Sequence, residues 1–391
     1  MPGKTADERA ALDAQNEIML ARFVEAGFRH IAPSILQPAD LFLDRSGEDI
    51  RTRTFVFTDP AGRELCLRPD LTLPTCRYHL ERAERPDAEA RYCYCGPAFR
   101  YQPGGADRMH PQEFVQVGVE WFAAGDREAC EADVLALAIG AVEAAGLRGY
   151  RVRLGDLALF NALIDSIPMP ARWRARLKHQ FWRPKAFRAL MERLAGQIGE
   201  THDPAEPLLE SIDGHGLERA EAVVEEVLEQ EGIPLVGGRS VTEIATRLHE
   251  RASDRREAPL TAAQIALVEQ YLAIDGAPAE ALGAMRSLGA DGSEAFSLAV
   301  ESLARRFALA GERGLPCADY RFSAEFGRNL EYYTGTVFQI EVKAATGWVP
   351  VAGGGRYDGL MGGIGSPVSV PAVGCAIHTE RLRAAVEDGN G

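Results

Sequence analysis

Apolar residues in the N-terminal part of the chain switch between helical and strand-like spacing. Over residues 6–26 they recur at near-helical intervals, and Gly27 follows as a suitable C-terminal cap, which predicts an amphipathic helix. Residues 54–68 form two alternating runs around the turn residues 59–62, which predicts a β-hairpin. In this part of the chain the pattern also predicts strands at 92–95, 114–121 and 150–154. It predicts a helix over 127–145.

The pattern changes at about residue 160 and changes back near residue 312. Between these points Ala, Leu, Glu and Arg predominate, strand-like runs are few, and Pro and Gly clusters interrupt the stretch, which predicts a helical insertion. Further elements are predicted as strands at 319–323, 336–342, 348–351 and 372–377 and a helix over 380–386. This order predicts an α+β fold divided into 1–164, 165–318 and 319–391.

Composition places the chain among ordinary globular proteins. Of its 391 residues 46% are apolar and 26% charged. The formal net charge of -14 argues against a surface that grips a nucleic-acid backbone, so nucleic acid is not an expected partner. No apolar run is long enough to span a membrane, and the N-terminus lacks the apolar core of a secretory signal. The seven scattered cysteines are expected to be reduced thiols, and we therefore expect a cytoplasmic protein.

The strand at 114–121 has two chemically different faces. Its valines and Trp121 share one side, which is expected to be core. Gln116 and Glu120 share the other side, separated by Gly118. Two interpretations stay open: a half-solvated strand with polar residues outward, or the floor of a cleft that binds a small cationic ligand.

Four neighbouring segments hold the groups that recognition of a free amino acid requires. They are Arg-Pro-Asp-Leu-Thr at 68–72, Gly-Pro-Ala-Phe-Arg at 96–100, Gly-Arg-Asn-Leu-Glu-Tyr-Tyr-Thr-Gly at 327–335 and Gly-Gly-Gly-Arg-Tyr-Asp-Gly at 353–359. An ammonium needs carboxylates, a carboxylate needs arginine or amide groups, and a side chain needs shaped polar partners. Together the segments supply all three.

These segments resemble the histidyl-tRNA synthetase family. The stretch at 327–335 is similar to its histidine-binding signature, 353–359 to its second signature, and 68–72 to its Arg-Pro-Glu-Gly-Thr loop. Residues 99–120 look like motif 2 of class II synthetases, and Glu380-Arg381 stands where motif 3 ends. The resemblance runs over about residues 10–385 and implies a class II synthetase-like antiparallel sheet flanked by helices.

The resemblance also implies a histidine pocket. Asp70, Thr72 and Glu120 would hold the ammonium, Gln116 and Arg328 would lie at the carboxylate, and Tyr333 and Tyr357 would hold the imidazole; Arg100 completes the predicted set. Tyr332 is expected in the core, and Arg356 either contacts ligand or forms a salt bridge to Asp358 or another local acid. No catalytic residue, cofactor or metal ion is expected.

Several positions depart from the synthetase pattern. Gln102 stands where synthetases read adenine with Glu, and His378 stands where a glycine is expected. Arg108 is the clear basic residue left in the motif 2 loop, which also holds Asp107, while Arg381 is retained. We interpret Gln102, Arg108, His378 and Arg381 as vestiges of an ATP site. The chain also stops ten residues after Arg381, so we expect it to lack the family's anticodon-binding domain.

Retained histidine contacts and decayed ATP features are typical of a sensor that performs no chemistry. The chain resembles the synthetase-like regulatory partner of the short-form ATP phosphoribosyltransferase. This implies three partners: the catalytic subunit, histidine as effector, and a second copy that meets the motif 1 region at 28–43 around Pro33. The alternatives are a truncated histidyl-tRNA synthetase that activates histidine with ATP, and a separate histidine- or tRNA-binding relative.

Two further features leave alternatives open. The basic and aromatic cluster at 172–188 is compatible with an RNA-facing patch, a surface for the partner subunit or a solvated helix face. Cys93 and Cys95 face the same side of a strand, but no second Cys or His pair stands at zinc spacing, so no metal site is expected there.

Overall fold

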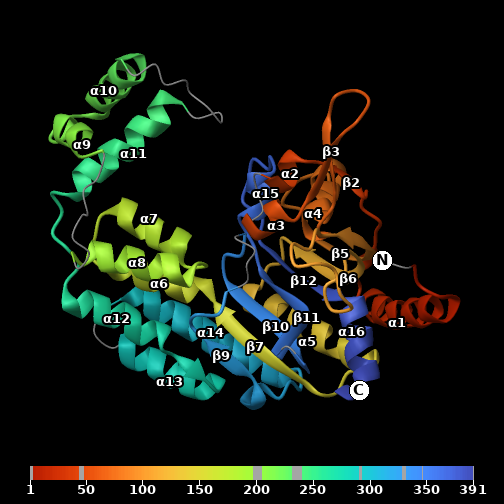
Figure 1. Ribbon diagram of the computed structural model, residues 1–391. Helices are drawn as coiled ribbons and strands as arrows, with labels where there is room; N and C mark the ends of the chain where they lie inside the picture. The colour runs from red at the N-terminus through yellow and green to blue at the C-terminus, as the bar shows by residue number, and fades with distance from the viewer. Residues whose placement is uncertain are drawn as a thin grey trace. The chain divides into compact units, whose positions relative to one another are not determined.

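The structure is a computed structural model that describes residues 3–43, 48–196, 205–230, 240–289, 293–327, 332–345 and 347–390. The chain forms two compact units (Figure 1). The first combines the residues up to Ser166 with those from Glu269 onward, and the second is Ile167–Val268.

A nine-stranded sheet forms the centre of the first unit. Neighbouring strands pair antiparallel, except that β1 with β5 and β7 with β9 are parallel. The spatial order is β1 (Arg29–His30), β5 (Ala90–Phe99), β6 (Glu113–Phe122), β12 (Ala372–His378), β11 (Gly347–Arg356), β10 (Thr336–Ala344), β7 (Tyr150–Asp156), β9 (Arg321–Ser323) and β8 (Asp275–Gly276). Strands from both ends of the sequence therefore meet where β6 pairs with β12.

A layer of helices covers one face of this sheet (Figure 1). Helix α1 (Ala6–Glu25) packs on β5 and β6, and α5 (Arg127–Ala144) packs on β10 to β12 and on α1. Helix α14 (Glu294–Glu312) lies against α5 and against α6 (Leu157–Ser166). The first unit also contains α2 (Asp40–Leu43), α3 (Glu48–Thr52), α12 (Ala262–Leu272, which begins in the second unit), α13 (Pro278–Gly289), η1 (Cys317–Asp319), α15 (Leu360–Gly363), α16 (Thr379–Ala385) and η2 (Val386–Asn390).

The boundaries of α1 follow directly from its sequence. Thr5 and Glu8 form a capping box at its start, where each side chain accepts a hydrogen bond from the other residue's backbone. Gly27, with φ of 88°, provides the left-handed conformation just after its end. The predicted helix at 6–26 is thus confirmed.

A small three-stranded sheet leads into helix α4 (Thr72–Arg82). Its order is β2 (Leu36–Pro38), β4 (Glu64–Leu67) and β3 (Phe55–Thr58), so the predicted hairpin over 54–68 is confirmed. Leu36, Phe55 and Leu67 are in register on one apolar face, and Leu36 is 51% exposed. Helix α4 was not predicted, because Pro74 and a short apolar run do not show clear helical periodicity.

The second unit is helical in the part that the structure describes. It contains α7 (Ala171–Gln180), α8 (Pro184–Leu194), α9 (Glu206–Ile212), α10 (Leu217–Gln230) and α11 (Val241–Asp254). It falls inside the stretch 165–318 for which we predicted a helical insertion. Residues 269–318 of that stretch are also largely helical, but they belong to the first unit.

The basic and aromatic cluster at 172–188 lies on α7 and α8. Trp173, Phe181 and Phe187 are buried, so these rings are not free to stack on bases. Arg172 and Arg176 both pair with Asp254, which also accepts a hydrogen bond from the Trp173 indole at 2.6 Å. This geometry favours a structural role for the cluster over an RNA-facing patch.

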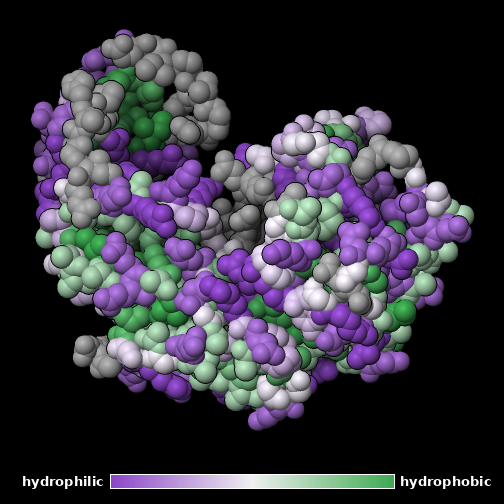
Figure 2. All heavy atoms as spheres, turned by 60° about the horizontal axis from the view of Figure 1, so that its bottom comes forward, coloured by the Kyte–Doolittle hydropathy of each residue, from purple (hydrophilic) through white to green (hydrophobic). Residues whose placement is uncertain are grey.

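On the face drawn in Figure 2, hydrophilic and hydrophobic side chains are interspersed. Among the helices of the described residues, none is both long and apolar enough to cross a membrane.

Candidate functional site

A buried carboxylate forms the centre of the site. Glu120 lies on β6 and is 1% exposed. The hydroxyls of Tyr94 and Tyr357 donate hydrogen bonds to its two oxygens, the first at 3.0 Å, and the Thr72 hydroxyl is also bonded to it. Because Gln116 and Glu120 are both buried, the half-solvated interpretation of this strand is wrong, and the strand lines a polar interior.

Two glycines provide the space for this carboxylate. A Cβ on Gly374 of β12 would lie 1.7 Å from Glu120 Oε2, and a Cβ on Gly118 would lie 2.6 Å from the Tyr94 hydroxyl. No ordinary side-chain contact is that short, so both positions require glycine. The space that we expected Gly118 to leave is thus occupied by Tyr94.

Replacing Gly374 by alanine is expected to destabilise the fold by about 1–3 kcal/mol, because the methyl group overpacks the site. Gly125→Ala is a matched control, since a Cβ there meets nothing within 4 Å. Chemical unfolding of both variants measures the difference. Equal stabilities would show that the sheet adjusts freely around Glu120.

A second carboxylate approaches from the loop before α4. Asp70 is buried, and its Oδ1 accepts the backbone N–H of Leu73 at 3.3 Å. Its Oδ2 has no hydrogen-bond partner, and neither has the Oε1 of buried Gln116. A buried oxygen without a donor costs free energy, so these two atoms are vacant acceptors for the N–H groups of a ligand.

Three tyrosines form an aromatic group beside these carboxylates. Tyr332, Tyr333 and Tyr357 are all buried, with ring centroids 4.8–6.4 Å apart. Tyr332 packs against both other rings, as its predicted core role requires. Arg328, another predicted site residue, lies outside the described residues.

Two arginines hold the loops that carry the site. Arg100 donates from Nε to the Pro69 carbonyl at 2.8 Å, and its guanidinium lies 5.4 Å from the Phe114 ring centre. Arg68, which we did not assign to the site, is buried and donates to the Pro97 carbonyl at 2.7 Å and to the Pro33 carbonyl. The role of Arg68 could not be read from sequence, since both acceptors are backbone atoms about 30 residues away.

The structure places three predicted vestigial ATP-site residues at one side of this region. His378 is buried and stacks on Phe114, with centroids 4.2 Å apart and planes 8° from parallel. Gln102 accepts a hydrogen bond from Arg53 at 2.6 Å and donates to the Pro111 carbonyl. Arg381 donates to the Met109 carbonyl at 2.6 Å and the Pro350 carbonyl at 3.1 Å.

Arg108, the fourth such residue, is directed elsewhere. It is exposed and forms ion pairs with Glu387 and Asp388 near the end of the chain. Asp107, the neighbouring acid in this loop, accepts hydrogen bonds from His110. In this arrangement Arg108 is committed to carboxylates rather than presented to a phosphate.

Burial controls the protonation of the site. The pKa of Glu120 is raised to about 8, mainly by burial and to a smaller extent by the nearby Asp70 charge, and burial also raises the pKa of Asp70 above its usual value. Hydrogen bonds from Tyr357, Thr72 and Tyr94 lower the pKa of Glu120 only in part. A bound ammonium favours the ionised carboxylate, so ligand binding near neutral pH is coupled to proton release.

We therefore expect the affinity of the site for a ligand that carries an ammonium group, such as the histidine that the sequence resemblance predicts, to rise with pH between 7 and 8. Below a pKa of about 8 Glu120 is mostly protonated, and it must lose its proton to bind the ammonium. The rise approaches about tenfold per pH unit at most. Calorimetry in buffers of different ionisation enthalpy measures the released proton directly. A binding enthalpy that does not depend on the buffer would contradict this coupling.

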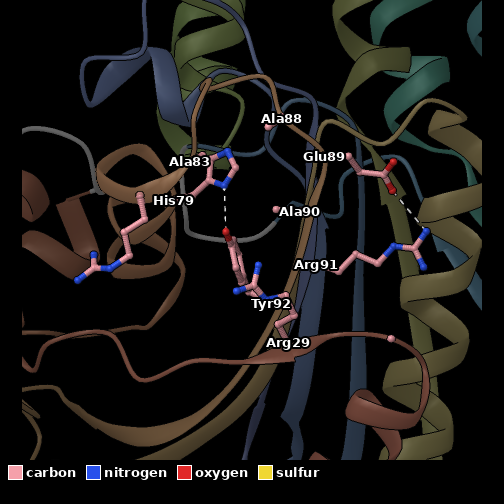
Figure 3. Close-up of a pocket in the computed structure, with 10 residues that line it drawn as sticks. Arg29, His79, Ala83, Ala88, Glu89, Ala90, Arg91 and Tyr92 are labelled. Atoms are coloured by element: carbon pink, nitrogen blue, oxygen red, sulfur yellow. Dashed lines mark hydrogen bonds and ion pairs between the residues drawn. The ribbon is translucent and has the colours of Figure 1, made fainter.

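A separate hollow of about 460 Å³ lies beside the start of β5 (Figure 3). Arg29, Arg82 and Arg91 are among its lining residues. Arg82 pairs with Glu81, Arg91 pairs with Glu89, and both guanidiniums also lie over aromatic rings. The His79 ring and the Tyr92 hydroxyl, 3.4 Å apart, face each other inside the hollow. Because most of its charge is already paired, this hollow is a weaker candidate than the carboxylate site.

Within the described residues no group of three or more His, Cys, Asp or Glu side chains is arranged to hold a metal ion. Cys93 is buried, with its thiol 3.7 Å from the Phe28 carbonyl, and all seven cysteines are free thiols.

The large, mostly antiparallel sheet flanked by helices is the fold of class II aminoacyl-tRNA synthetase-like proteins. A family model described as histidyl-tRNA synthetase matches residues 5–382.

Two solved structures share the fold. One, titled an ATP phosphoribosyltransferase regulatory subunit/histidyl-tRNA synthetase from Bacillus halodurans, is 21% identical with a TM-score of 0.66, covering 100% of this chain and 82% of the other. The other, a histidine–tRNA ligase subunit from Alicyclobacillus acidocaldarius, is 24% identical with a TM-score of 0.61, covering 100% and 97%.

Two curated relatives are closer in sequence. An ATP phosphoribosyltransferase regulatory subunit from Mesorhizobium japonicum is 35% identical over 90% of this chain and 91% of its own length. One of the same name from Rhizobium johnstonii is 34% identical over 93% and 95%. The chain therefore belongs to the histidyl-tRNA synthetase family and, within it, to the ATP phosphoribosyltransferase regulatory subunits.

Proposed function

We propose that this chain acts in the cytoplasm as a non-catalytic subunit that activates the short-form catalytic subunit of ATP phosphoribosyltransferase and conveys feedback inhibition by histidine. The observation that carries the histidine assignment is the pair of buried carboxylates, Asp70 and Glu120, with a vacant oxygen on Asp70 and tyrosines alongside. Family membership supplies the catalytic partner.

Each part of free histidine has a matching group in the site. Asp70, Glu120 and Thr72 bind the ammonium, and the Tyr333 and Tyr357 side chains enclose the imidazole. At the carboxylate, Arg100 and Arg328 supply charge and the Gln116 amide donates a hydrogen bond. Binding with different affinity in two states of the complex is sufficient for feedback, so no group in the site needs to react.

The absence of catalysis is supported by how the motif 2 and motif 3 residues are used. The His378 ring covers a face of Phe114, Gln102 is bonded within the protein, and Arg108 pairs with carboxylates. The alternative, ATP-dependent activation of histidine, predicts histidine-dependent exchange of pyrophosphate into ATP. We expect no exchange above background.

Self-association through the motif 1 region is supported by exposed apolar side chains there. Ile35 is 39% exposed and Leu36 is 51% exposed, and Phe57 on the same small sheet is 40% exposed. A second copy of the chain would cover this surface. Sedimentation of Leu36→Asp against the unchanged chain tests it, and an unaltered dimer in that variant contradicts this interface.

The deciding experiment measures ATP phosphoribosyltransferase activity of the catalytic subunit with and without this chain across a histidine titration. We expect activation by the chain, and loss of the activated rate as histidine rises. If the chain changes neither the rate nor its response to histidine, the regulatory function is wrong, and pyrophosphate exchange then distinguishes a synthetase from a separate histidine-binding protein.

A further inference from the structure

A series of buried ion pairs begins directly behind the carboxylate site. Arg356 is the last residue of β11 and precedes Tyr357, which donates to Glu120. Arg356 is 1% exposed, and its guanidinium bonds to Glu131 of α5 and to Asp358, the latter at 2.9 Å. Of the roles left open from sequence for Arg356, the structure thus shows the salt bridge.

Glu131 shares its carboxylate between two arginines. One oxygen accepts from Arg356 and the other from Arg306 of α14. Arg306 then donates to Asp156, the last residue of β7, at 2.7 Å. Burial alone would lower the pKa of Arg356 and Arg306, but the neighbouring carboxylates raise both pKa values above the usual one, so both stay charged.

A backbone connection reaches the same place by a different path. The N–H of Thr334, beside the site residue Tyr333, donates to the Arg356 carbonyl at 2.8 Å. The carbonyl of Gly335 accepts from the N–H of Leu157 at 3.1 Å. Leu157 follows Asp156 and begins α6, which runs to the boundary of the second unit. The ion-pair series and the signature loop therefore meet at the start of α6.

The packing around Glu131 leaves room for a second arrangement. A cavity of about 30 Å³ is lined by Glu131, Arg306 and apolar side chains of α5, α14, β7 and β10. A buried ion pair is often no more stable than an apolar replacement of the same volume, so stability alone does not explain charges kept here. A charged side chain that bonds to two partners beside a cavity can exchange one partner for the other when the structure switches between two arrangements.

We propose that Glu131 and Arg306 are positioning residues that couple occupancy of the carboxylate site to helices α6 and α14; this rests on the proposed function. A ligand ammonium at Glu120 competes with the Tyr357 hydroxyl for the carboxylate oxygens. Displacement of Tyr357 moves its neighbour Arg356, and Glu131 must then shift its hydrogen bonds between Arg356 and Arg306. Arg306 carries the change into α14, and Asp156 carries it to the start of α6.

The test uses the complete complex of this chain with its catalytic subunit, in which histidine binding and inhibition are measured separately. Glu131→Gln keeps the shape of the side chain but removes its charge. We expect the dissociation constant for histidine to stay within about threefold, while the maximal inhibition at saturating histidine falls at least about fivefold. Asp133→Asn is the matched control, since Asp133 pairs with Arg313 across the same two helices without touching Arg356. It should leave both quantities unchanged.

A second variant keeps the proposal testable if Glu131→Gln does not fold. Arg306→Lys retains the charge on a shorter reach and should give intermediate inhibition with unchanged histidine affinity. Normal maximal inhibition in folded Glu131→Gln or Arg306→Lys overturns the coupling. The coupling is also overturned if a variant binds histidine more weakly but reaches normal maximal inhibition at a higher histidine concentration. That result would show that the residue acts only in the pocket. If the unchanged chain neither binds histidine nor conveys inhibition, the proposed function itself fails, whatever the variants do.

Discussion

Glu120→Gln should weaken histidine binding by about 30-fold to several thousand-fold. A buried, hydrogen-bonded charge pair costs about 2–5 kcal/mol when one partner is neutralised, and each 1.4 kcal/mol corresponds to tenfold in affinity. Glutamine has nearly the same shape, so it can keep contacts to Tyr94 and Tyr357. Calorimetric titration with histidine measures the loss, and inhibition of the complex should require correspondingly more histidine.

The same substitution should not unfold the protein. The raised pKa of Glu120 means that burial already penalises its charged form, so an uncharged side chain relieves that cost. Glu113→Gln is the control, since Glu113 lies on the same strand but is exposed. Histidine affinity that is unchanged in Glu120→Gln would place the sensor site elsewhere, and assembly with the catalytic subunit should persist in both variants.

Arg356→Met should lower the free energy of unfolding by about 3–5 kcal/mol. The substitution leaves the buried Glu131 with Arg306 alone and the partly buried Asp358 with Arg127 alone, and removing one partner from a buried ion pair is strongly destabilising. Urea unfolding followed by circular dichroism measures the loss.

Arg305→Met is the comparison for this prediction. Arg305 pairs with Asp126 and Glu128 near the start of the same α5 helix, but it is 48% exposed, so water screens the interaction. The expected cost there is below about 1 kcal/mol. If both substitutions cost the same, burial does not dominate the energetics of the Arg356 ion pairs.

The fold could be predicted largely from sequence because its elements carry local signals. Alternation over 114–121 marks β6, and the turn residues at 59–62 mark the hairpin. The second signature motif, at 353–359, supplied Tyr357, whose hydroxyl donates to the buried Glu120. Helix α4 escaped prediction because its start is set by packing of Thr72 and Asp70 into the site rather than by a periodic pattern.

The supporting residues could not be predicted because their partners are distant in sequence. Tyr94 reaches Glu120 through the register of β5 with β6, where it lies opposite Gly118. Arg306 meets Glu131 across 175 positions. Local periodicity in the sequence does not predict such long-range pairs. A buried arginine in a helix cannot be distinguished from an exposed one until the positions of the neighbouring elements are known.

The stack of His378 on Phe114 bears on what the protein is able to measure. While the imidazole covers that face of Phe114, no flat ring from a nucleotide can lie there. A subunit that senses histidine, as proposed, would therefore bind it without a nucleotide ring stacked on that face of Phe114.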